Sequence, residues 1–175
     1  MNRINKTRWS LVTLTVIMLS LASCNNNGKE IAILKAGNDS LSKQLTDYED
    51  TLRQQKFNIK LVADFYQQLF GDKDISAIDR YIGDVYIQHN PSLKDGKEAL
   101  KAGASQWFKG APKEKIDIQH IGADGNLVYI HTRSKRGDKV DSVIDIFRVE
   151  NGKITEHWDV IQEVPAQSPN PHPMF

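Results

Sequence analysis

Residues 139–162 read KVDSVIDIFRVENGKITEHWDVIQ, and this stretch decides the fold. Two runs rich in valine, isoleucine and aromatic residues flank the sequence ENGK at 150–153, where Asn-Gly readily adopts the positive φ angles of a tight turn. The stretch therefore predicts a β-hairpin. Its strands are almost continuously apolar, which indicates that both faces are covered. The polar residues Asp145, His157 and Asp159 interrupt this pattern and need a functional or structural reason.

Two turns fit the hairpin, and they place these polar side chains differently. With a three-residue loop at 150–152, Asp145 faces His157, and both share one face with Asp159. With a two-residue loop at 151–152, Asp145 lies on the opposite face from His157 and Asp159, because side chains alternate along a strand. We favour the three-residue loop because it gathers the acid/base groups on one face. This preference rests on chemistry and not on backbone geometry.

Length and charge limit the function classes. The chain has 175 residues, enough for one ordinary domain with appendages. Its 23 basic and 22 acidic residues give a formal net charge of +1, so no electrostatic footprint for nucleic acid is present. The sequence has no glycine-rich phosphate loop, no nucleophile elbow and no evident set of metal ligands. We therefore expect neither a cofactor nor a metal.

The N-terminus has the pattern of an export signal. Basic residues precede an apolar run at 9–21 that is too short to span a bilayer comfortably, which predicts a signal peptide at 1–23. The sequence LASC at 21–24 resembles the lipobox of bacterial lipoproteins. This resemblance implies lipidation of Cys24 and a lipid-anchored protein of the cell envelope, at the outer membrane or cell surface. The alternative is an ordinary signal peptide in which Cys24, the only cysteine, has no such role.

Residues 24–56 are predicted to be a tether followed by a helical stalk. The sequence NNNG at 25–28 is polar and favours a flexible segment. Apolar residues then recur at heptad spacing. One heptad position holds Ile31, Asn38, Leu45, Leu52 and Ile59, and the other holds Leu34, Leu41, Tyr48, Gln55 and Val62. The stalk is either a parallel dimerising coiled coil whose register is set by Asn38, or a single amphipathic helix frayed near Gly37.

Residues 57–165 are predicted to form the globular domain, with an irregular proline-rich tail at 166–175. The order of elements predicts an α+β fold in which helices cover one face of a curved antiparallel sheet. Such a sheet leaves a conical cavity suited to an apolar small molecule. Helices are predicted at 60–70, 75–82 and after the turn at 95–96 to 109, and strands at 85–89, 115–121, 127–133, 140–149 and 153–162.

Four motifs of this domain resemble SnoaL-like proteins of the nuclear transport factor 2-like superfamily, in the branch labelled as predicted aldol-condensation-catalysing. The resemblance covers about residues 57–165 and implies a cone-shaped α+β barrel with a pocket, commonly a homodimer through its sheet. The motifs are YIQHNP at 86–91, DG at 95–96, ADGNLVYIH at 123–131 and DIFRVENGKITEHWD at 145–159.

The resemblance also implies roles for site residues. Polyketide cyclases of this type use an aspartate on the last strands as acid/base in an aldol ring closure, and Asp159 is the position that fits. A histidine on the neighbouring strand assists in those cyclases, whereas this chain has Asp145 at the corresponding place. Removing a proton next to a carbonyl needs a base and a donor for the enolate oxygen. We expect Asp159 as base, His157 or His89 as donor and proton partner, and Asp145 as orienter or protonated donor.

Each role has a structural alternative. Asp159 is alternatively a strand-end carboxylate bound to backbone amides, and Asp145 is alternatively half of an ion pair with Arg133 or His157. His89 is alternatively bonded to the turn that follows it. The sequence therefore predicts an exported, lipid-anchored domain that binds an apolar small molecule and catalyses an aldol or isomerase type of reaction. The alternative is a non-catalytic module that binds a ligand or a protein at the cell envelope.

Overall fold

The computed structural model describes the backbone of residues 6–175 and side chains from residue 27 onward. The chain divides into two compact units, Met1–Asp50 and Thr51–Phe175. Helix α1 (Lys6–Tyr66) contributes to both units. Among the described residues, no helix combines the length and the apolar character needed to cross a bilayer. The predicted signal peptide begins at residues outside the described set, and the side chain of Cys24 also lies outside it.

In the first unit, α1 corrects one expectation. The helix runs through residues 25–28, where the sequence predicts a flexible tether, and through Gly37, where fraying was an alternative. No proline interrupts this region, and extending an existing helix needs no new nucleation. Apolar side chains at the heptad positions are between 59% and 67% exposed, namely those of Ile31, Leu34, Leu41, Leu45 and Tyr48.

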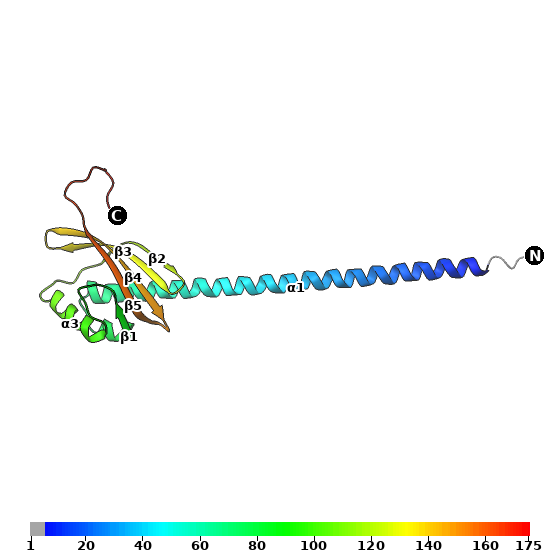
Figure 1. Ribbon diagram of the computed structural model, residues 1–175, viewed down its shortest axis with the longest axis horizontal. Helices are drawn as coiled ribbons and strands as arrows, with labels where there is room; N and C mark the ends of the chain where they lie inside the picture. Colours follow the sequence, from blue (N-terminus) through cyan, green and yellow to red (C-terminus); the bar gives the residue numbers. More distant parts are fainter. Residues whose placement is uncertain (1–5) are drawn as a thin grey trace, which may run out of the picture. The chain divides into compact units, whose positions relative to one another are not determined.

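The second unit confirms the predicted α+β fold (Figure 1). After α1 come a π-helical turn (Gln67–Gly71), α2 (Ala77–Tyr81), β1 (Ile82–Gln88) and α3 (Lys97–Trp107). The remaining elements are β2 (Asp117–Asp124), β3 (Leu127–Arg136), β4 (Lys139–Glu150) and β5 (Lys153–Glu163). The strands form one sheet in the order β1-β5-β4-β3-β2.

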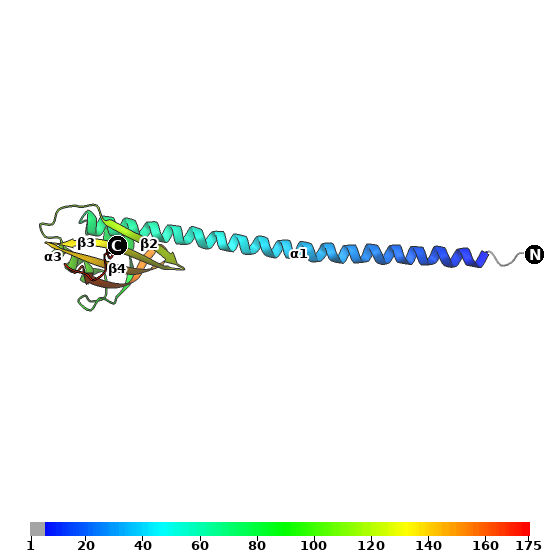
Figure 2. The ribbon, with the colours of Figure 1, turned by 90° about the horizontal axis from the view of Figure 1, so that it is seen from above.

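Strand β1 is an exception to the predicted antiparallel sheet. Strands β2 to β5 pair antiparallel, but β1 pairs parallel with β5. The four later strands follow each other through short turns, which impose antiparallel pairing. Between β1 and β5 the chain passes through α3 and the other three strands, so no tight turn fixes the direction of β1 relative to β5. Figure 2 shows the same sheet from a second direction.

The core lies between the helices and the inner face of the sheet. Phe65 of α1 packs edge-on against Phe147 of β4, with ring centroids 5.9 Å apart. This aromatic contact joins the helical layer to the sheet. Other fully buried residues come from both layers and include Val62, Leu69, Ile78, Ile82, Val128, Ile130 and Ile154. The burial of this face determines which side chains of β4 and β5 point inward.

The turn of the β4–β5 hairpin is shorter than the sequence analysis favours. Glu150 pairs with Lys153, so the loop consists of Asn151 and Gly152 alone. Both loop residues have positive φ, 51° and 72°, as in a type I′ turn. The preference for a three-residue loop was therefore wrong. Asparagine and glycine tolerate this left-handed backbone, and the right-handed twist of the strands favours a two-residue loop.

A β-bulge then restores the face that was predicted. The register shifts between Val149 and Arg148, which leaves Thr155 as an extra residue on β5. Beyond the bulge, Asp145 pairs with Asp159 and Phe147 pairs with His157. Asp145, His157 and Asp159 consequently share one face, as expected, although the residue pairs differ from those predicted. The bulge compensates for the shorter turn.

Candidate functional site

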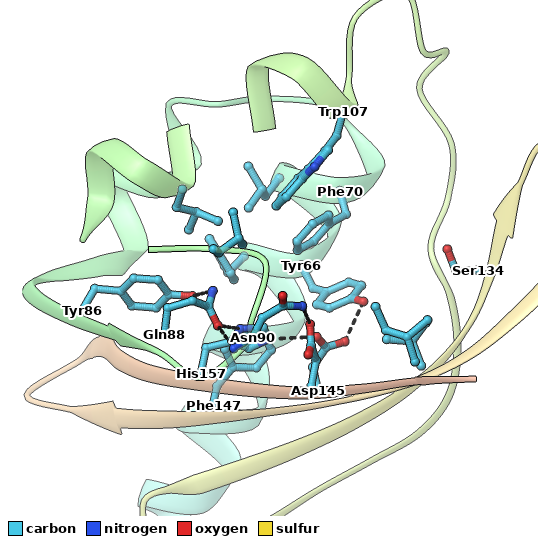
Figure 3. Close-up of a pocket in the computed structure, with 17 residues that line it drawn as sticks. Tyr66, Phe70, Tyr86, Gln88, Asn90, Trp107, Ser134, Asp145, Phe147 and His157 are labelled. Carbon is cyan, nitrogen blue, oxygen red and sulfur yellow. Dashed lines mark hydrogen bonds and ion pairs between the residues drawn. The ribbon is translucent and has the colours of Figure 1, made fainter. Parts of the chain in front are cut away.

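A cavity of about 240 Å³ lies between the helices and the inner face of β4 and β5 (Figure 3). Its wall is mainly apolar and includes Phe70, Leu93, Leu100, Trp107, Val143 and Ile161. Most polar groups of the wall gather at one place, on β4, β5 and the end of β1, together with Tyr66 of α1, whereas Ser134 of β3 lies apart from them. The cavity is therefore an apolar pocket with a localised polar site, which is the usual form of a small-molecule site.

Asp145 and His157 form a buried pair in this polar site. The two residues are 5% and 7% exposed, and His157 Nε2 lies 2.9 Å from Asp145 Oδ1. The hydroxyl of Tyr66, on α1, donates to the other carboxylate oxygen at 2.8 Å. Of the two partners considered for Asp145, His157 is the one that it contacts. Both oxygens of Asp145 are thus held by protein groups.

Tyr66 remains a hydrogen-bond donor over the ordinary pH range. Burial raises the pKa of its phenol well above 10.0, and the nearby charge of Asp145 raises it further. Burial likewise raises the pKa of Tyr86, with additional contributions from Asp145 and Asp159. An ionised phenol at either position would be poorly solvated and close to carboxylates. The phenols are therefore protonated neighbours of the site.

The other side of His157 contacts the end of β1. His157 Nδ1 lies 2.8 Å from Gln88 Oε1, and the backbone N–H of Asn90 donates to the same oxygen at 3.0 Å. Gln88 Nε2 lies 3.4 Å from the hydroxyl of Tyr86, which faces the same cavity (Figure 3). The imidazole of His157 is therefore held at both nitrogens. It also stacks on Phe147, with centroids 4.7 Å apart.

Asp159 is less constrained than Asp145. It lines the cavity, is half-buried, and accepts a hydrogen bond from Asn90 Nδ2 at 2.6 Å. Within the described part of the chain, no lysine or arginine forms an ion pair with its carboxylate. The alternative of a carboxylate bound to backbone amides is not what the structure shows, because the donor is a side-chain amide. Asp159 thus presents a carboxylate to the cavity.

Asp145, His157 and Asp159 form one cluster. Each offers one ligand atom, and these atoms lie within 4.8 Å of one another. Two carboxylates and an imidazole are a ligand set that divalent metals accept, and these three are the described residues that could hold an ion. A metal would have to replace the present bond between Asp145 and His157. The cluster is equally suited to moving protons.

His89, also predicted as a site residue, lies elsewhere. Its Nε2 is 2.8 Å from Glu156 Oε1, and its ring stacks on Trp158 with centroids 4.6 Å apart. His89 is therefore not the donor and proton partner that the sequence analysis expected, because its ring contacts Glu156 and does not line the cavity. Because side chains alternate along an extended chain, the inward direction of Gln88 sends His89 to the outer face.

Gln88, Asn90 and Tyr66 are site residues that the sequence analysis missed. The first two could have been found from strand alternation, since Tyr86, Gln88 and Asn90 are spaced by two. The chemistry of histidine points to His89 instead, although strand alternation does not. Tyr66 carried no such signal, because its role depends on how α1 packs on the sheet.

The fold and the pocket define an α+β domain whose mainly apolar cavity holds a localised group of polar side chains. The family model described as "SnoaL-like domain" matches residues 62–157, more than half of the 175 residues. The chain therefore belongs to the SnoaL-like family. The matched region contains the π-helical turn, strands β1 to β4 and the first part of β5, which it follows as far as His157. It therefore includes Gln88, Asn90 and Asp145.

Solved structures share the fold at low sequence identity. A candidate ketosteroid isomerase from Kribbella flavida is 14% identical with a TM-score of 0.53, over 67% of this chain and 85% of that one. A candidate SnoaL-like polyketide cyclase from Jannaschia is 15% identical with a TM-score of 0.52, over 61% and 86%. An LEH-like epoxide hydrolase from M. tuberculosis is 21% identical with a TM-score of 0.50, over 62% and 85%. No curated protein matches the sequence.

Proposed function

We propose that the domain binds an apolar carbonyl compound and catalyses proton transfer next to its carbonyl group, as in an aldol or isomerase reaction. The observation that carries this proposal is the half-buried carboxylate of Asp159, which faces an apolar cavity beside the Asp145–His157 pair. Among the lining residues there is no lysine or arginine. The pocket therefore favours an uncharged ligand over an anionic one, because a buried anion needs a partner.

We assign a role to each polar group from its position in the site. Asp159 is the base that takes the proton, and the amide of Asn90 holds its carboxylate in place. The amide nitrogen of Asn90 carries a second hydrogen, which we assign as a donor to the substrate oxygen. The Asp145–His157 pair supplies the proton that is returned to the substrate, and Asp159 then passes the proton that it took to the pair, which restores both groups. In a mainly apolar cavity, these interactions are stronger than in water.

The activities named for two structural relatives agree with this proposal. Ketosteroid isomerisation and polyketide cyclisation both begin with removal of a proton next to a carbonyl group. Those activities belong to the relatives, whose identity to this chain is too low to transfer them. The agreement concerns only the class of chemistry that the fold accommodates.

A non-catalytic ligand-binding module is the second candidate. It is favoured by the binding of both Asp145 oxygens to protein groups, Tyr66 and His157. A purely structural network would look the same at this position. Asp159 discriminates between the two candidates, because an enzyme of the proposed kind needs its carboxylate and a passive pocket does not.

Deuterium exchange tests the proposed chemistry without knowledge of the substrate. The full chain is incubated in D2O with a panel of apolar cyclic ketones, and deuterium at the carbon next to the carbonyl is measured by mass spectrometry. We expect exchange with at least one ketone, reduced roughly 100-fold or more by Asp159→Asn, because general-base catalysis contributes about 10²–10⁴. Asp138→Asn removes an exposed carboxylate in the β3–β4 turn and should leave the rate unchanged.

Calorimetry with the same ketones separates the two candidates. Binding without exchange would favour the passive module. Neither binding nor exchange across the panel would contradict both candidates. Exchange that survives Asp159→Asn would remove Asp159 from the proposed role.

We also propose that the chain is exported and anchored by lipid at Cys24, at the outer membrane or the cell surface. The support is the sequence pattern alone: the basic and apolar segments at 1–21 and the LASC motif at 21–24. Several acyl chains on one cysteine would give firm attachment. The SnoaL-like domain would then act at the cell envelope.

A homodimer is the third part of this proposal. Heptad positions of α1 expose Ile31, Leu34 and Leu41, which a second copy could cover. In a parallel pair, Glu30 at position g of one helix faces Lys35 at position e of the other, an attractive contact. The outer face of the sheet offers a further surface, where Ile144 and Val160 are exposed.

A further inference from the structure

The orientation of the Gln88 amide is fixed by its surroundings. Gln88 ends β1, and one end of its amide lies 3.0 Å from the backbone nitrogen of Asn90. A backbone N–H can only donate, so the atom that faces it must be the amide oxygen. The amide nitrogen then faces the hydroxyl of Tyr86. The reversed orientation would place two donors against each other.

This orientation determines where His157 carries hydrogen. The same Gln88 oxygen lies 2.8 Å from His157 Nδ1, and an amide oxygen can only accept. His157 Nδ1 must therefore carry the hydrogen. The other nitrogen, Nε2, is the one that faces Asp145 Oδ1 at 2.9 Å. The choice of tautomer is thus made by Gln88 and not by the acidic partner.

With hydrogen on Nδ1, Nε2 and Asp145 Oδ1 would be two acceptors facing each other at 2.9 Å unless a proton lies between them, so the gap contains a transferable proton. With Nδ1 protonated, a proton in this gap sits either on Nε2, giving an imidazolium and a carboxylate, or on Asp145, giving two neutral groups. Both arrangements are chemically accessible. If the only ring hydrogen were on Nε2, its transfer to Asp145 would leave an imidazolate anion, which is not accessible. A mobile proton at Asp145 therefore requires hydrogen on Nδ1.

We propose that Gln88 is a positioning residue that holds His157 in the Nδ1–H form and so keeps a transferable proton between His157 and Asp145, beside Asp159. The catalytic meaning of this assignment rests on the proposed function. The assignment of the tautomer does not depend on the proposed function, because it follows from the hydrogen bonds of Gln88. Gln88 acts through His157, and its backbone N–H is held separately by Asp95 Oδ1 at 2.8 Å. A change of its side chain thus leaves the end of the strand anchored.

Nitrogen NMR of the full chain, labelled with ¹⁵N at histidine, tests the tautomer directly. The chain has five histidines, and His157→Gln assigns the signal of interest. In the wild type we expect a pyrrole-like Nδ1 at every pH at which the protein is folded. In Gln88→Leu we expect Nδ1 to become pyridine-like on the alkaline side, with the hydrogen on Nε2 facing Asp145. A wild-type Nδ1 without hydrogen would overturn the proposal, whether or not the variant folds.

Two further variants separate positioning from packing. Gln88→Glu keeps an acceptor toward Asn90 and His157 and should retain the Nδ1–H form. Gln162→Leu changes an exposed glutamine of β5 and should leave the His157 signal unchanged. A purely structural role would lower stability in Gln88→Leu without changing the tautomer. If Nδ1 keeps its hydrogen in Gln88→Leu, the proposal is overturned.

The exchange assay then tests the catalytic consequence. We expect Gln88→Leu to slow ketone exchange by about 10- to 100-fold and Gln88→Glu to retain most of the rate, since a misplaced proton partner removes part of acid/base catalysis. Absence of exchange in the wild type would contradict the proposed function and leave the tautomer to be judged by NMR. If the hydrogen of His157 moves from Nδ1 to Nε2 in Gln88→Leu but the rate of ketone exchange is unchanged, the proposed role of Gln88 in catalysis is overturned.

Discussion

At the scale of single residues, the two carboxylates of the site differ in how they are held. Asp145 is buried and bound at both oxygens, by Tyr66 and His157. Asp159 is half-buried and bound by a single amide, that of Asn90. A carboxylate that is hydrogen-bonded at both oxygens is suited to orienting its partners, and one that faces a cavity is suited to reacting with a ligand. This difference is the basis of the roles proposed for them.

Tyr66→Phe should destabilise the protein by about 1.5–3 kcal/mol, because it removes a hydrogen bond to a buried charged group. The ring and its contacts with Phe70 and Phe147 are retained, so the effect isolates the hydroxyl. Urea unfolding followed by tryptophan fluorescence measures it. Tyr129→Phe removes a hydroxyl from an exposed site on the sheet and should change stability by less than about 0.5 kcal/mol. Equal effects in the two variants would contradict the importance of the Tyr66–Asp145 bond.

Alkaline pH should weaken the fold through the buried tyrosines. Burial raises the pKa of Tyr66 and of Tyr86 above the ordinary 10.0. Above about pH 10 the unfolded chain therefore loses these protons while the folded chain keeps them, and stability falls as pH rises. Each tyrosine should contribute a slope of up to about 1.4 kcal/mol per pH unit. Urea unfolding at several alkaline pH values measures the slope, and Tyr66→Phe should make it shallower.

Residue chemistry in the sequence predicted part of this site. Asp145, His157 and Asp159 could be selected because they interrupt apolar strands, and the structure brings them together. His89 was selected for the same chemical reason and lies on the outer face. The direction of a side chain depends on its place in the strand, so chemical type alone is an incomplete guide. Tyr66 could not be selected, since its contact with Asp145 joins residues far apart in the sequence.

At the scale of elements, the β4–β5 hairpin sets the geometry of the site. Its two-residue turn fixes the pairing of Val149 with Ile154, and the bulge at Thr155 then shifts the register. Without the bulge, a two-residue turn would place His157 and Asp159 on the face opposite Asp145. The bulge is thus the local feature that assembles the acid/base cluster. Bulges often re-aim side chains beside functional sites.

Gly152→Ala should destabilise the hairpin by about 1–2 kcal/mol. Gly152 has φ of 72°, and a side chain in this left-handed region brings Cβ close to the following carbonyl oxygen. Space is not the limit, since the nearest atom to an added Cβ is Phe57 Cε1 at 4.0 Å. Thermal or urea unfolding measures the change.

Gly122→Ala in β2 is the matched control. An added Cβ at Gly122 meets no atom within 4 Å, and its backbone is not left-handed. Alanine in a strand should be neutral or stabilising by up to about 1 kcal/mol. Gly152→Ala should therefore lower the free energy of unfolding while Gly122→Ala does not, and equal losses in the two variants would contradict the assignment of strain to Gly152.

At the scale of the whole molecule, the assignment of the domain rests on its structure and its family, whereas the roles of the segments before it rest on sequence patterns. The second unit has a buried core and belongs to the SnoaL-like family. The first unit is a helix whose described apolar side chains are exposed. Export, lipid attachment and dimerisation are proposals for these preceding segments, and each can be tested in cells or with the full chain.

Cys24→Ser should release the protein from the membrane fraction or leave an unprocessed precursor. The reason is that serine has no thiol to form the thioether bond to lipid. Cell fractionation and incorporation of radiolabelled palmitate in a bacterial host measure this. Ser23→Ala keeps a small residue before the cysteine and should be processed normally. Labelling that persists in Cys24→Ser would contradict lipid attachment at this residue.

Leu41→Glu should weaken a dimer formed by α1, because it places a charge at an apolar seam position. Sedimentation of the full chain in detergent measures the oligomeric state. Ser40→Glu adds the same charge at an adjacent position away from the seam and should leave the dimer intact. A monomeric wild type, or equal effects of the two variants, would exclude a stalk dimer.

The sequence by itself determined the order of helices and strands, the α+β class, the family and the chemical identity of the acid/base cluster. These follow from local patterns: hydrophobic periodicity, turn residues and motifs within short stretches. Tertiary structure alone decided the parallel pairing of β1, the register beyond the bulge, the outward direction of His89 and the contacts of Tyr66 and Gln88. Each of these depends on which surfaces meet when distant segments pack, and burial on the inner face selects among arrangements that are locally equivalent.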